Sequence, residues 1–316
     1  MGTFYKDSTP LVEMNVPGTH DTSTWNYTQS TQAEFYEYTG TDIVPAKIYQ
    51  CQDRSIFSQL NAGMRAFDLR IGFGPDNTTI IFYHSAAILS LTATLEDVLD
   101  GFYQFLDENP TEMIFLSIKV DNTTYGEPLA LEQKLYSILT STPATSYFLD
   151  VTSTLPTLGE TRGKLVLLRR FDLSLLPSAP ALGLNVSAGW LDNVANFSIP
   201  LGSGKNAYIE DYYELDGVNG TNEVITYKYN ATVKHLEAAK NTDLNQLWIS
   251  FSSAELDTAI PPDTPRILAL GNGTGTPGVN QRLLPYYQAT KSNRRGIVLM
   301  DWFAQVPGLV ESVIGM

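Results

Sequence analysis

Cysteine is scarce in this sequence, since Cys51 is the only one among 316 residues. A single cysteine excludes an intrachain disulfide, so the core must hold together without one. Cys51 also lies in a polar stretch without a thiol-enzyme motif, which argues against a catalytic cysteine. Long apolar runs are missing as well: none approaches the roughly 18 residues that a membrane-spanning helix needs. The sequence therefore predicts no transmembrane segment.

Basic residues are few, with 20 Lys and Arg against 34 Asp and Glu, for a formal net charge of −14. This balance argues against non-specific nucleic-acid binding, which needs a basic surface, and we expect no nucleic-acid partner. It also argues against simple electrostatic docking on anionic lipid, although a local basic pocket remains possible. With 43% hydrophobic and 17% charged residues, the composition is that of an ordinary globular protein.

Sequons for N-glycosylation, Asn-X-Ser/Thr with X other than proline, occur eight times. They begin at Asn26, Asn77, Asn122, Asn185, Asn196, Asn219, Asn230 and Asn272. Their number and their spread along the chain favour a secreted, extracellular, N-glycosylated protein. The alternative is a surface that is simply rich in Asn and Thr.

Short apolar runs alternate with helical patterns along the chain. The runs predict buried strands of a parallel sheet at 11–16, 64–69, 79–83, 113–118, 164–168, 207–210, 247–251 and 296–300. Helices are predicted at 55–61, 95–107, 129–139, 223–240 and before Arg295, the second of them with Thr94 as N-cap. This alternation predicts one α/β domain over residues 1–316, a distorted TIM (β/α)8 barrel. Irregularity is expected because 26–50 and 171–200 show no clear helix.

Polar side chains follow the predicted strands where each strand ends. The strand ends carry His20, Asp21, Arg70, His84, Lys119, Arg170, Asp211 and Asp301. Parallel strands of a barrel open their carboxyl ends on one face, and that face carries the chemistry. We therefore expect these residues, far apart in the sequence, to converge on one site.

Two of the three histidines, His20 and His84, occupy such strand ends. One such histidine could be structural, but two in matching positions favour acid–base catalysis, in which one imidazole takes a proton and the other gives one. The third, His235, lies within the helical pattern ATVKHLEAAK and is predicted to be an exposed helix residue.

Three cations, Arg70, Lys119 and Arg170, follow strands at the same face of the predicted barrel and indicate a substrate with a phosphate group. The alternative for each of them is an ion pair with a neighbouring carboxylate, which Asp68, Asp211 or Asp301 could supply. A His pair with Arg, without clustered Cys or His ligands, resembles ribonuclease-style cleavage of a phosphodiester more than hydrolysis by zinc.

Seven motifs follow one another along the chain: VPGTHDT at 16–22, GMRAFDLR at 63–70, FYH at 82–84, PTEMIFLSIK at 110–119, RGKLVLLRR at 162–170, IEDYY at 209–213 and GIVLMDW at 296–302. Together they resemble the X domain of phosphatidylinositol-specific phospholipase C. They keep the family's order over nearly the whole chain, which makes the series far more specific than any single motif. The likeness is greatest to the small secreted bacterial-type enzymes.

The resemblance implies a distorted TIM barrel that cleaves phosphatidylinositol, in membranes or micelles, to diacylglycerol and inositol 1,2-cyclic phosphate. It makes His20 the general base, oriented by Asp301. It makes His84 the general acid, helped by Asp21. Arg70, oriented by Asp68, would neutralise the charge that builds on the phosphate. The inositol ring would be held by Lys119, Arg170, Asp211 and Tyr213.

The same resemblance bears on cofactors and partners. In calcium-dependent relatives the position of Arg70 is acidic and an Asn follows the first His, whereas this chain has Arg70 and Asp21. A guanidinium in place of the ion predicts no metal and no other cofactor. We expect a monomer that makes transient contact with a membrane surface. Two alternatives stay open: a related barrel phosphodiesterase for another head group or a glycosylated lipid anchor, and a non-catalytic secreted binding protein on the same fold.

Overall fold

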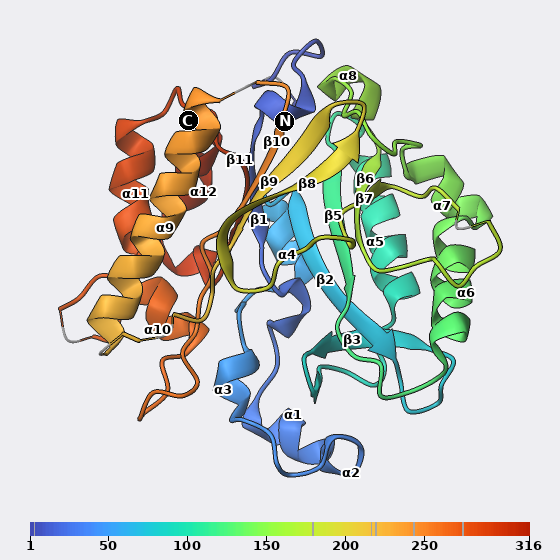
Figure 1. Cartoon of the computed structure of the whole chain (residues 1–316), viewed down its shortest axis with the longest axis horizontal. Coiled ribbons are helices and arrows are strands. Elements are labelled where there is room, and N and C mark those ends of the chain that lie inside the picture. The colour runs from blue at the N-terminus through green and yellow to red at the C-terminus, as the bar shows by residue number, and fades with distance from the viewer. Residues whose placement is uncertain (3, 179, 216, 219, 243, 274) are drawn as a thin grey trace.

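The computed structural model describes the whole chain except residues 3, 179, 216, 219, 243 and 274. An eleven-stranded sheet forms its centre (Figure 1), in the order β7-β6-β5-β2-β1-β11-β10-β9-β8. Its parallel strands are β1 (Asn15–Thr19), β2 (Ala66–Phe73), β5 (Ile114–Val120), β6 (Leu165–Arg170), β7 (Leu184–Asn185), β9 (Lys205–Asp211), β10 (Leu247–Phe251) and β11 (Gly296–Met300). The sheet curls into a nearly closed barrel, which confirms the predicted distorted TIM barrel.

Antiparallel pairing at two places in the sheet makes the barrel irregular. β8 (Val194–Gly202) pairs antiparallel with β9 at one end of the sheet order. β3 (Ile80–His84) pairs antiparallel with β2 and continues into β4 (Ala87–Ile88). The prediction of a parallel barrel strand at 79–83 is therefore wrong, because only a few residues separate this strand from β2 and a parallel pair needs a long crossover.

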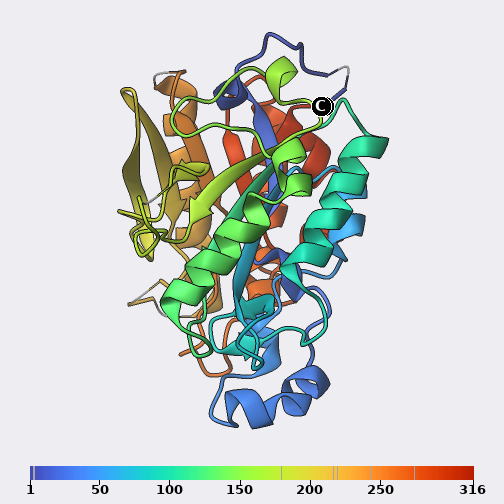
Figure 2. The same cartoon turned by 90° about the vertical axis from the view of Figure 1, so that its right-hand side faces the viewer.

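Helices surround the barrel and cover its outer face (Figures 1 and 2). The longer ones are α5 (Leu95–Glu108), α6 (Pro128–Leu139), α9 (Thr221–Asn241) and α11 (Val279–Ala289). The shorter ones are α4 (Ile56–Asn61), α7 (Thr142–Tyr147), α8 (Leu158–Thr161), α10 (Pro265–Leu270) and α12 (Leu309–Ile314). α5 begins as predicted, because the Thr94 side chain caps its first turn and the Asp97 carboxylate bonds back in a capping box.

Residues 26–50 contain only short helices, in agreement with the missing helical pattern. These are α1 (Gln29–Glu34), α2 (Tyr36–Thr39) and α3 (Ala46–Tyr49). Both cartoon views show α1 and α2 projecting from the end of the molecule toward which β2 and β5 run, the C-terminal end of the parallel strands (Figures 1 and 2). They therefore stand on the side of the barrel where the predicted site residues gather.

Two apolar layers hold the barrel together. One fills its interior and includes Val16, Phe115, Ile249 and Leu299. The other lies between the sheet and the helices, where Phe67 of β2 contacts Phe102 of α5 at a ring separation of 5.1 Å. Strands that are buried on both faces explain the nearly continuous apolar runs of the sequence.

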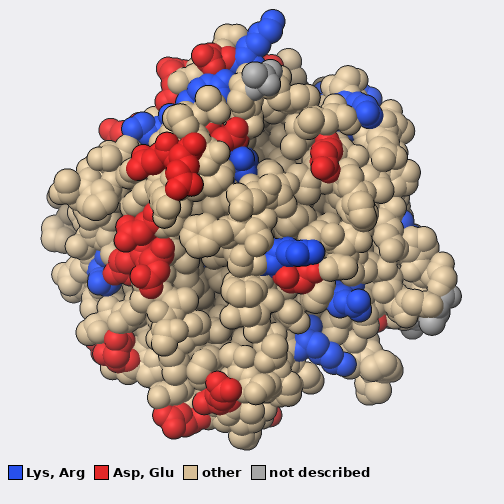
Figure 3. Space-filling model, turned by 180° about the vertical axis from the view of Figure 1, so that it is seen from behind, with Lys and Arg blue, Asp and Glu red and all other residues tan. Residues whose placement is uncertain are grey.

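Most of the described sequon asparagines lie on the surface of the protein. Five sequon asparagines are exposed, namely Asn26, Asn77, Asn185, Asn196 and Asn230, while Asn122 and Asn272 are half-buried. Asn219 lies outside the described residues. On the face shown in Figure 3, carboxylates form several clusters and the Lys and Arg side chains are spread between them. Among the described helices, none has the length and apolar character to cross a membrane.

Candidate active site

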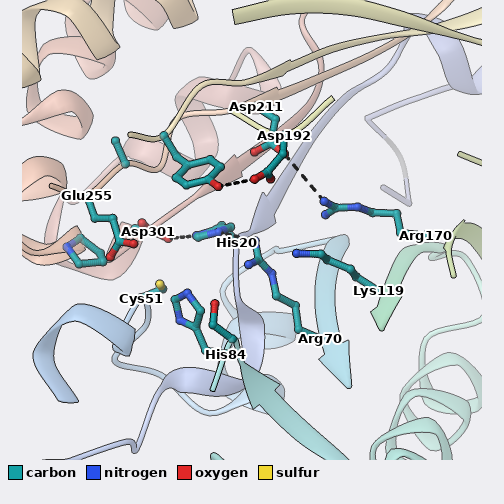
Figure 4. A pocket seen from close by; sticks show the side chains of 14 residues that line it. His20, Cys51, Arg70, His84, Lys119, Arg170, Asp192, Asp211, Glu255 and Asp301 are labelled. Carbon is teal, nitrogen blue, oxygen red and sulfur yellow. Dashed lines mark hydrogen bonds and ion pairs between the residues drawn. The ribbon is translucent and has the colours of Figure 1, made fainter. Parts of the chain in front are cut away.

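A pocket opens at the C-terminal ends of the strands, and strand alternation explains why the predicted residues meet there (Figure 4). Successive side chains of a strand point to opposite faces, so every second residue enters the barrel. In β6, Leu168 belongs to the interior core and Arg170 follows two residues later. The same step leads from the core residue Leu299 of β11 to Asp301 and from Ile209 of β9 to Asp211. The site is thus the polar top layer of the barrel core.

His20 follows β1 and is held in one tautomer. Its Nδ1 lies 2.9 Å from Oδ1 of Asp301, and its Nε2 lies 2.8 Å from Nη2 of Arg70. A guanidinium nitrogen can only donate, so Nε2 accepts and Nδ1 carries the proton given to Asp301. Burial and the nearby Arg70 and His84 lower the pKa of His20 well below its usual value. His20 is therefore a neutral base with its lone pair at the pocket.

His84 ends β3 and has the opposite arrangement. Its Nδ1 donates to the Tyr49 carbonyl at 2.9 Å, and its Nε2 lies 3.3 Å from Oδ2 of Asp21. A carbonyl and a carboxylate both accept, so each ring nitrogen of His84 faces an acceptor and can direct a proton toward it. The His20 and His84 rings stand 6.3 Å apart at 86° to each other, so an imidazole that faces a donor and one that faces acceptors share the same pocket.

Asp21 links the two histidines to Arg70. It sits in the left-handed region with φ 41°, and its Oδ2 lies 3.1 Å from Nε2 of His20 while its Oδ1 lies 3.0 Å from Nε of Arg70. Burial raises the pKa of Asp21 to about 6, against the lowering effect of Arg70 and His84. This carboxylate is therefore poised to change its charge near neutral pH.

Asp68 of β2 anchors the cations from below. It is fully buried, and it accepts from Nε of Arg70 and Nη1 of Arg170, each at 3.2 Å, and from Ser117 Oγ at 3.2 Å. Burial alone would raise the pKa of Asp68, but Arg70 and Arg170 outweigh it and the pKa is lowered. In turn, the carboxylates of Asp21 and Asp68 raise the pKa of Arg70, although burial of the guanidinium lowers it. Arg70 is thus a fixed positive charge.

Lys119 and Arg170 form the cationic wall of the pocket. Each of them also pairs with a neighbouring carboxylate, which was the alternative interpretation of the cations in the sequence. Lys119 Nζ lies 2.6 Å from Oδ1 of Asp121. Arg170 contacts Asp68 and stacks on the Trp190 ring at 3.7 Å, while Trp190 Nε1 donates to Asp211 at 2.7 Å. Pairing and pocket lining are therefore compatible, because both cations still line the pocket.

The acidic wall contains residues that sequence reasoning missed. Tyr213 and Asp211 line the pocket as predicted, and the Tyr213 hydroxyl donates to Asp192 at 2.7 Å. Asp192, Glu255 and Cys51 also line the pocket but were not predicted. Asp192 lies in the irregular segment before β8, and Glu255 stands four residues beyond β10, so neither follows directly on an apolar run.

His235 contradicts its prediction as an exposed residue. Only 3% of its surface is accessible, and its Nδ1 lies 2.8 Å from the Ser250 hydroxyl of β10. Burial lowers the pKa of His235 to about 3, so it stays neutral. The error arose because α9 buries a polar face: Lys228, on the same helix, is fully buried and lies 2.6 Å from Glu210 of β9.

Potential metal ligands also meet at this site. Among the described residues, His20, Asp21 and Cys51 place ligand atoms within 4.8 Å of one another. Arg70 contacts two of these three residues, so a cation bound there would face a fixed guanidinium at close range. The electrostatics thus favour an anion rather than a metal ion in this pocket.

The fold and site together define the class of the protein. Two imidazoles, one facing a guanidinium donor and one facing acceptors, lie beside Arg70 in a pocket with one cationic and one acidic wall (Figure 4). This arrangement can remove a proton from one oxygen and deliver a proton to another while it stabilises negative charge between them. The geometry is therefore suited to acid–base chemistry on a phosphate ester in a barrel protein.

Comparisons with known proteins show a likeness to one family. Residues 39–171 match the model of "Phosphatidylinositol-specific phospholipase C, X domain". The 1-phosphatidylinositol phosphodiesterase of Listeria monocytogenes is 33% identical over 162 residues, which cover 51% of this chain and 45% of that protein. The Staphylococcus aureus protein of the same name is 26% identical over 253 residues, covering 78% and 72%. The aligned part therefore spans less than half of the first relative.

Solved structures show the same fold over the full length. A phosphatidylinositol-specific phospholipase C from Staphylococcus aureus superposes with a TM-score of 0.77 at 22% identity, covering 99% of this chain and 95% of that one. The Listeria monocytogenes enzyme gives 0.69 at 24% identity, covering 99% and 96%. The chain thus resembles the phosphatidylinositol-specific phospholipase C X domain in sequence over residues 39–171 and resembles these enzymes in fold over its full length.

Proposed function

We propose that this protein is a secreted, metal-independent phospholipase C that cleaves phosphatidylinositol. The observation that carries the proposal is the pair of imidazoles beside Arg70: His20 with an accepting Nε2 and His84 with donating nitrogens, their rings 6.3 Å apart. The relatives of similar sequence are named 1-phosphatidylinositol phosphodiesterase, which supports the choice of substrate.

The first step transfers the phosphoryl group within the substrate. His20 Nε2 takes the proton of the inositol 2-hydroxyl, whose oxygen then forms a bond to phosphorus. The bond from phosphorus to the diacylglycerol oxygen breaks, and His84 donates its Nε2 proton to that oxygen. The products are diacylglycerol and inositol 1,2-cyclic phosphate, and water can open the ring with the two histidines in exchanged roles.

The other site residues position and stabilise. Asp301 keeps the proton of His20 on Nδ1 and balances the imidazolium that forms during the reaction. Arg70 compensates the charge on the phosphate oxygens. Lys119, Arg170, Asp211 and Tyr213 line the head-group side of the pocket, where hydroxyls of inositol would find both donors and acceptors.

Contact with lipid would involve apolar side chains in loops at this end of the barrel. Ile260 is 99% exposed in the loop that follows Glu255, and Leu191 is 50% exposed next to Asp192, a residue of the pocket wall. Trp25 is 37% exposed five residues after His20. With a net charge of −14, insertion of such side chains is a better mode of transient attachment than attraction to anionic lipid.

Secretion, glycosylation and a monomeric state are part of the proposal. The five exposed sequon asparagines support glycosylation in an extracellular setting. Expression in a glycosylating host, followed by glycosidase digestion and light scattering, tests all three. Secretion with a loss of mass on digestion and a monomer mass supports them, and an intracellular, unmodified or dimeric protein contradicts them.

Product analysis tests the enzymatic proposal. Phosphorus NMR of a reaction with phosphatidylinositol micelles should show the cyclic phosphate first, and turnover should not change with EDTA. His20→Ala and His84→Ala should each lower turnover by at least about 10²–10⁴. A strict need for calcium or magnesium would overturn the mechanism. Turnover of another head group instead would favour a related barrel phosphodiesterase, and no turnover of any lipid would favour a binding protein.

A further inference from the structure

Glu255 is a half-buried residue of the pocket whose carboxylate the proposed mechanism does not use. It lines the same cavity as His20, His84 and Asp301. Its Oε2 is buried and accepts no hydrogen bond from the described part of the chain. The backbone around it is fixed, because the Glu255 amide donates to the Tyr213 carbonyl at 3.0 Å. A buried carboxylate oxygen without a donor is unfavourable, so its retention in a pocket points to a donor that arrives with the substrate.

The groups that act on Glu255 cannot supply this donor. Asp21, Asp257 and Glu214 are carboxylates, and they add to the burial that raises the pKa of Glu255 to about 7. His84 is the cation that opposes this rise, but its two ring nitrogens already face the Tyr49 carbonyl and Asp21. Glu255 therefore remains an unsatisfied acceptor until a ligand binds.

The position of Glu255 indicates which part of the substrate reaches it. Figure 4 shows Glu255 and Cys51 on one side of the His20–Arg70 pair, and Lys119 and Arg170 on the other. The cationic side binds the head group in the proposed function. Glu255 therefore faces the alcohol that leaves, whose oxygen receives the proton of His84.

We propose that Glu255 is a specificity-determining residue that favours inositol phospholipids whose leaving alcohol carries a free hydroxyl or amide N–H beside the phosphoester. This inference rests on the proposed function and refines its substrate class. The ester groups of diacylglycerol contain only acceptors, so they leave Glu255 unpaired. A ceramide offers a hydroxyl and an amide N–H, and a monoacylglycerol offers a hydroxyl. The bonds made and broken at phosphorus stay the same.

Competition between matched lipids tests the proposal. Phosphatidylinositol, lysophosphatidylinositol and inositol phosphoceramide are compared as kcat/KM in detergent micelles at equal mole fraction. We expect the wild-type protein to prefer at least one donor-bearing lipid over phosphatidylinositol by roughly tenfold, since a site built to bind a hydroxyl or N–H discriminates against analogues that lack it. The lipid that is preferred identifies the donor as a ceramide or a monoacylglycerol.

Variants separate a role in specificity from a role in folding. Glu255→Leu removes the acceptor and should abolish the preference while turnover of phosphatidylinositol persists. Glu255→Gln keeps one acceptor oxygen and should retain part of the preference. Asp150→Leu removes an exposed carboxylate that does not line the pocket and is the matched control, with unchanged preference. Circular dichroism confirms that each variant is folded.

The outcomes are distinct. A wild-type protein without preference for either donor-bearing lipid, or a Glu255→Leu variant that keeps the preference or loses all three activities equally, overturns the inference and leaves the proposed function standing. A wild-type protein that cleaves none of the three lipids overturns the proposed function itself.

Discussion

Substitution of Arg70 by Lys and by Met should separate charge from geometry in this site. Nε of Arg70 lies 3.0 Å from Asp21 and 3.2 Å from Asp68, and Nη2 lies 2.8 Å from His20. Lysine keeps the positive charge but has one nitrogen, which cannot contact all three partners together. We therefore expect Arg70→Lys to lower kcat by about 10²–10³, or roughly 2.7–4 kcal/mol of transition-state stabilisation.

The Met variant should add a loss of stability. Arg70→Met leaves Asp21 and Asp68 buried without their shared cation, and breaking a buried pair in this way costs about 3–5 kcal/mol. With an unfolding entropy of about 2.1 cal/mol/K per residue, roughly 0.7 kcal/mol/K for this chain, the Tm should fall by about 4–7 °C. The Lys variant should keep a Tm close to that of the wild type.

Initial rates on phosphatidylinositol micelles and thermal unfolding followed by circular dichroism measure the two effects. A Lys variant within tenfold of the wild-type rate would refute the claim that the planar fork is required. A Met variant that loses activity but keeps its Tm would show that Arg70 does not compensate the two carboxylates.

Three further predictions concern Asp301, the pH profile of the reaction and the buried ion pair between Lys228 of α9 and Glu210 of β9. Asp301→Asn should lower kcat by about 10²–10⁴ with an unchanged circular dichroism spectrum, because the imidazolium of His20 loses its counter-charge; near-normal turnover would contradict this role. As pH falls below about 6, Asp21 takes up a proton and kcat/KM should decrease, whereas a rate that stays level down to pH 4 would exclude the effect. Protonation of Asp21 itself favours the folded state, because its folded pKa of about 6 exceeds the unfolded value of 3.8. Activity should therefore fall with pH, while a pH titration of Tm shows no loss of stability from this group. Lys228→Met should lower the free energy of unfolding by about 3–5 kcal/mol in denaturant titrations, because it leaves Glu210 buried without its partner. The double variant Lys228→Met with Glu210→Gln should recover part of this loss. Equal losses in both variants would argue against the ion pair.

The barrel and many of its pocket-lining residues could be predicted because they follow one rule. Apolar strands of a parallel barrel end on one face, so Arg170, Asp211 and Asp301 could be assigned to one site from their positions after apolar runs. The helix α5 could be placed to within one residue because its apolar stripe and its Thr94 cap agree.

The parts that could not be predicted depend on tertiary contacts. The apolar run at 79–83 reads like any barrel strand, and only its short connection to β2 makes it antiparallel. His235 has helical neighbours, but its burial depends on Ser250 of a distant strand. Glu255 reaches the pocket through a loop whose course is fixed by pairing with Tyr213, which no local pattern encodes.

The antiparallel hairpin of β3 and β4 has a consequence for how the two proton-transfer groups are held. His20 follows a central strand with parallel partners on both sides, whereas His84 ends a strand off the main barrel, paired there with β4 through Ala87. The His84 imidazole is fixed by the Tyr49 carbonyl from α3, part of the projecting segment. Anchorage of that segment at an interface would thus act on the imidazole proposed to give the proton, and Asp21, which contacts both rings, would couple this movement to the imidazole proposed to take one.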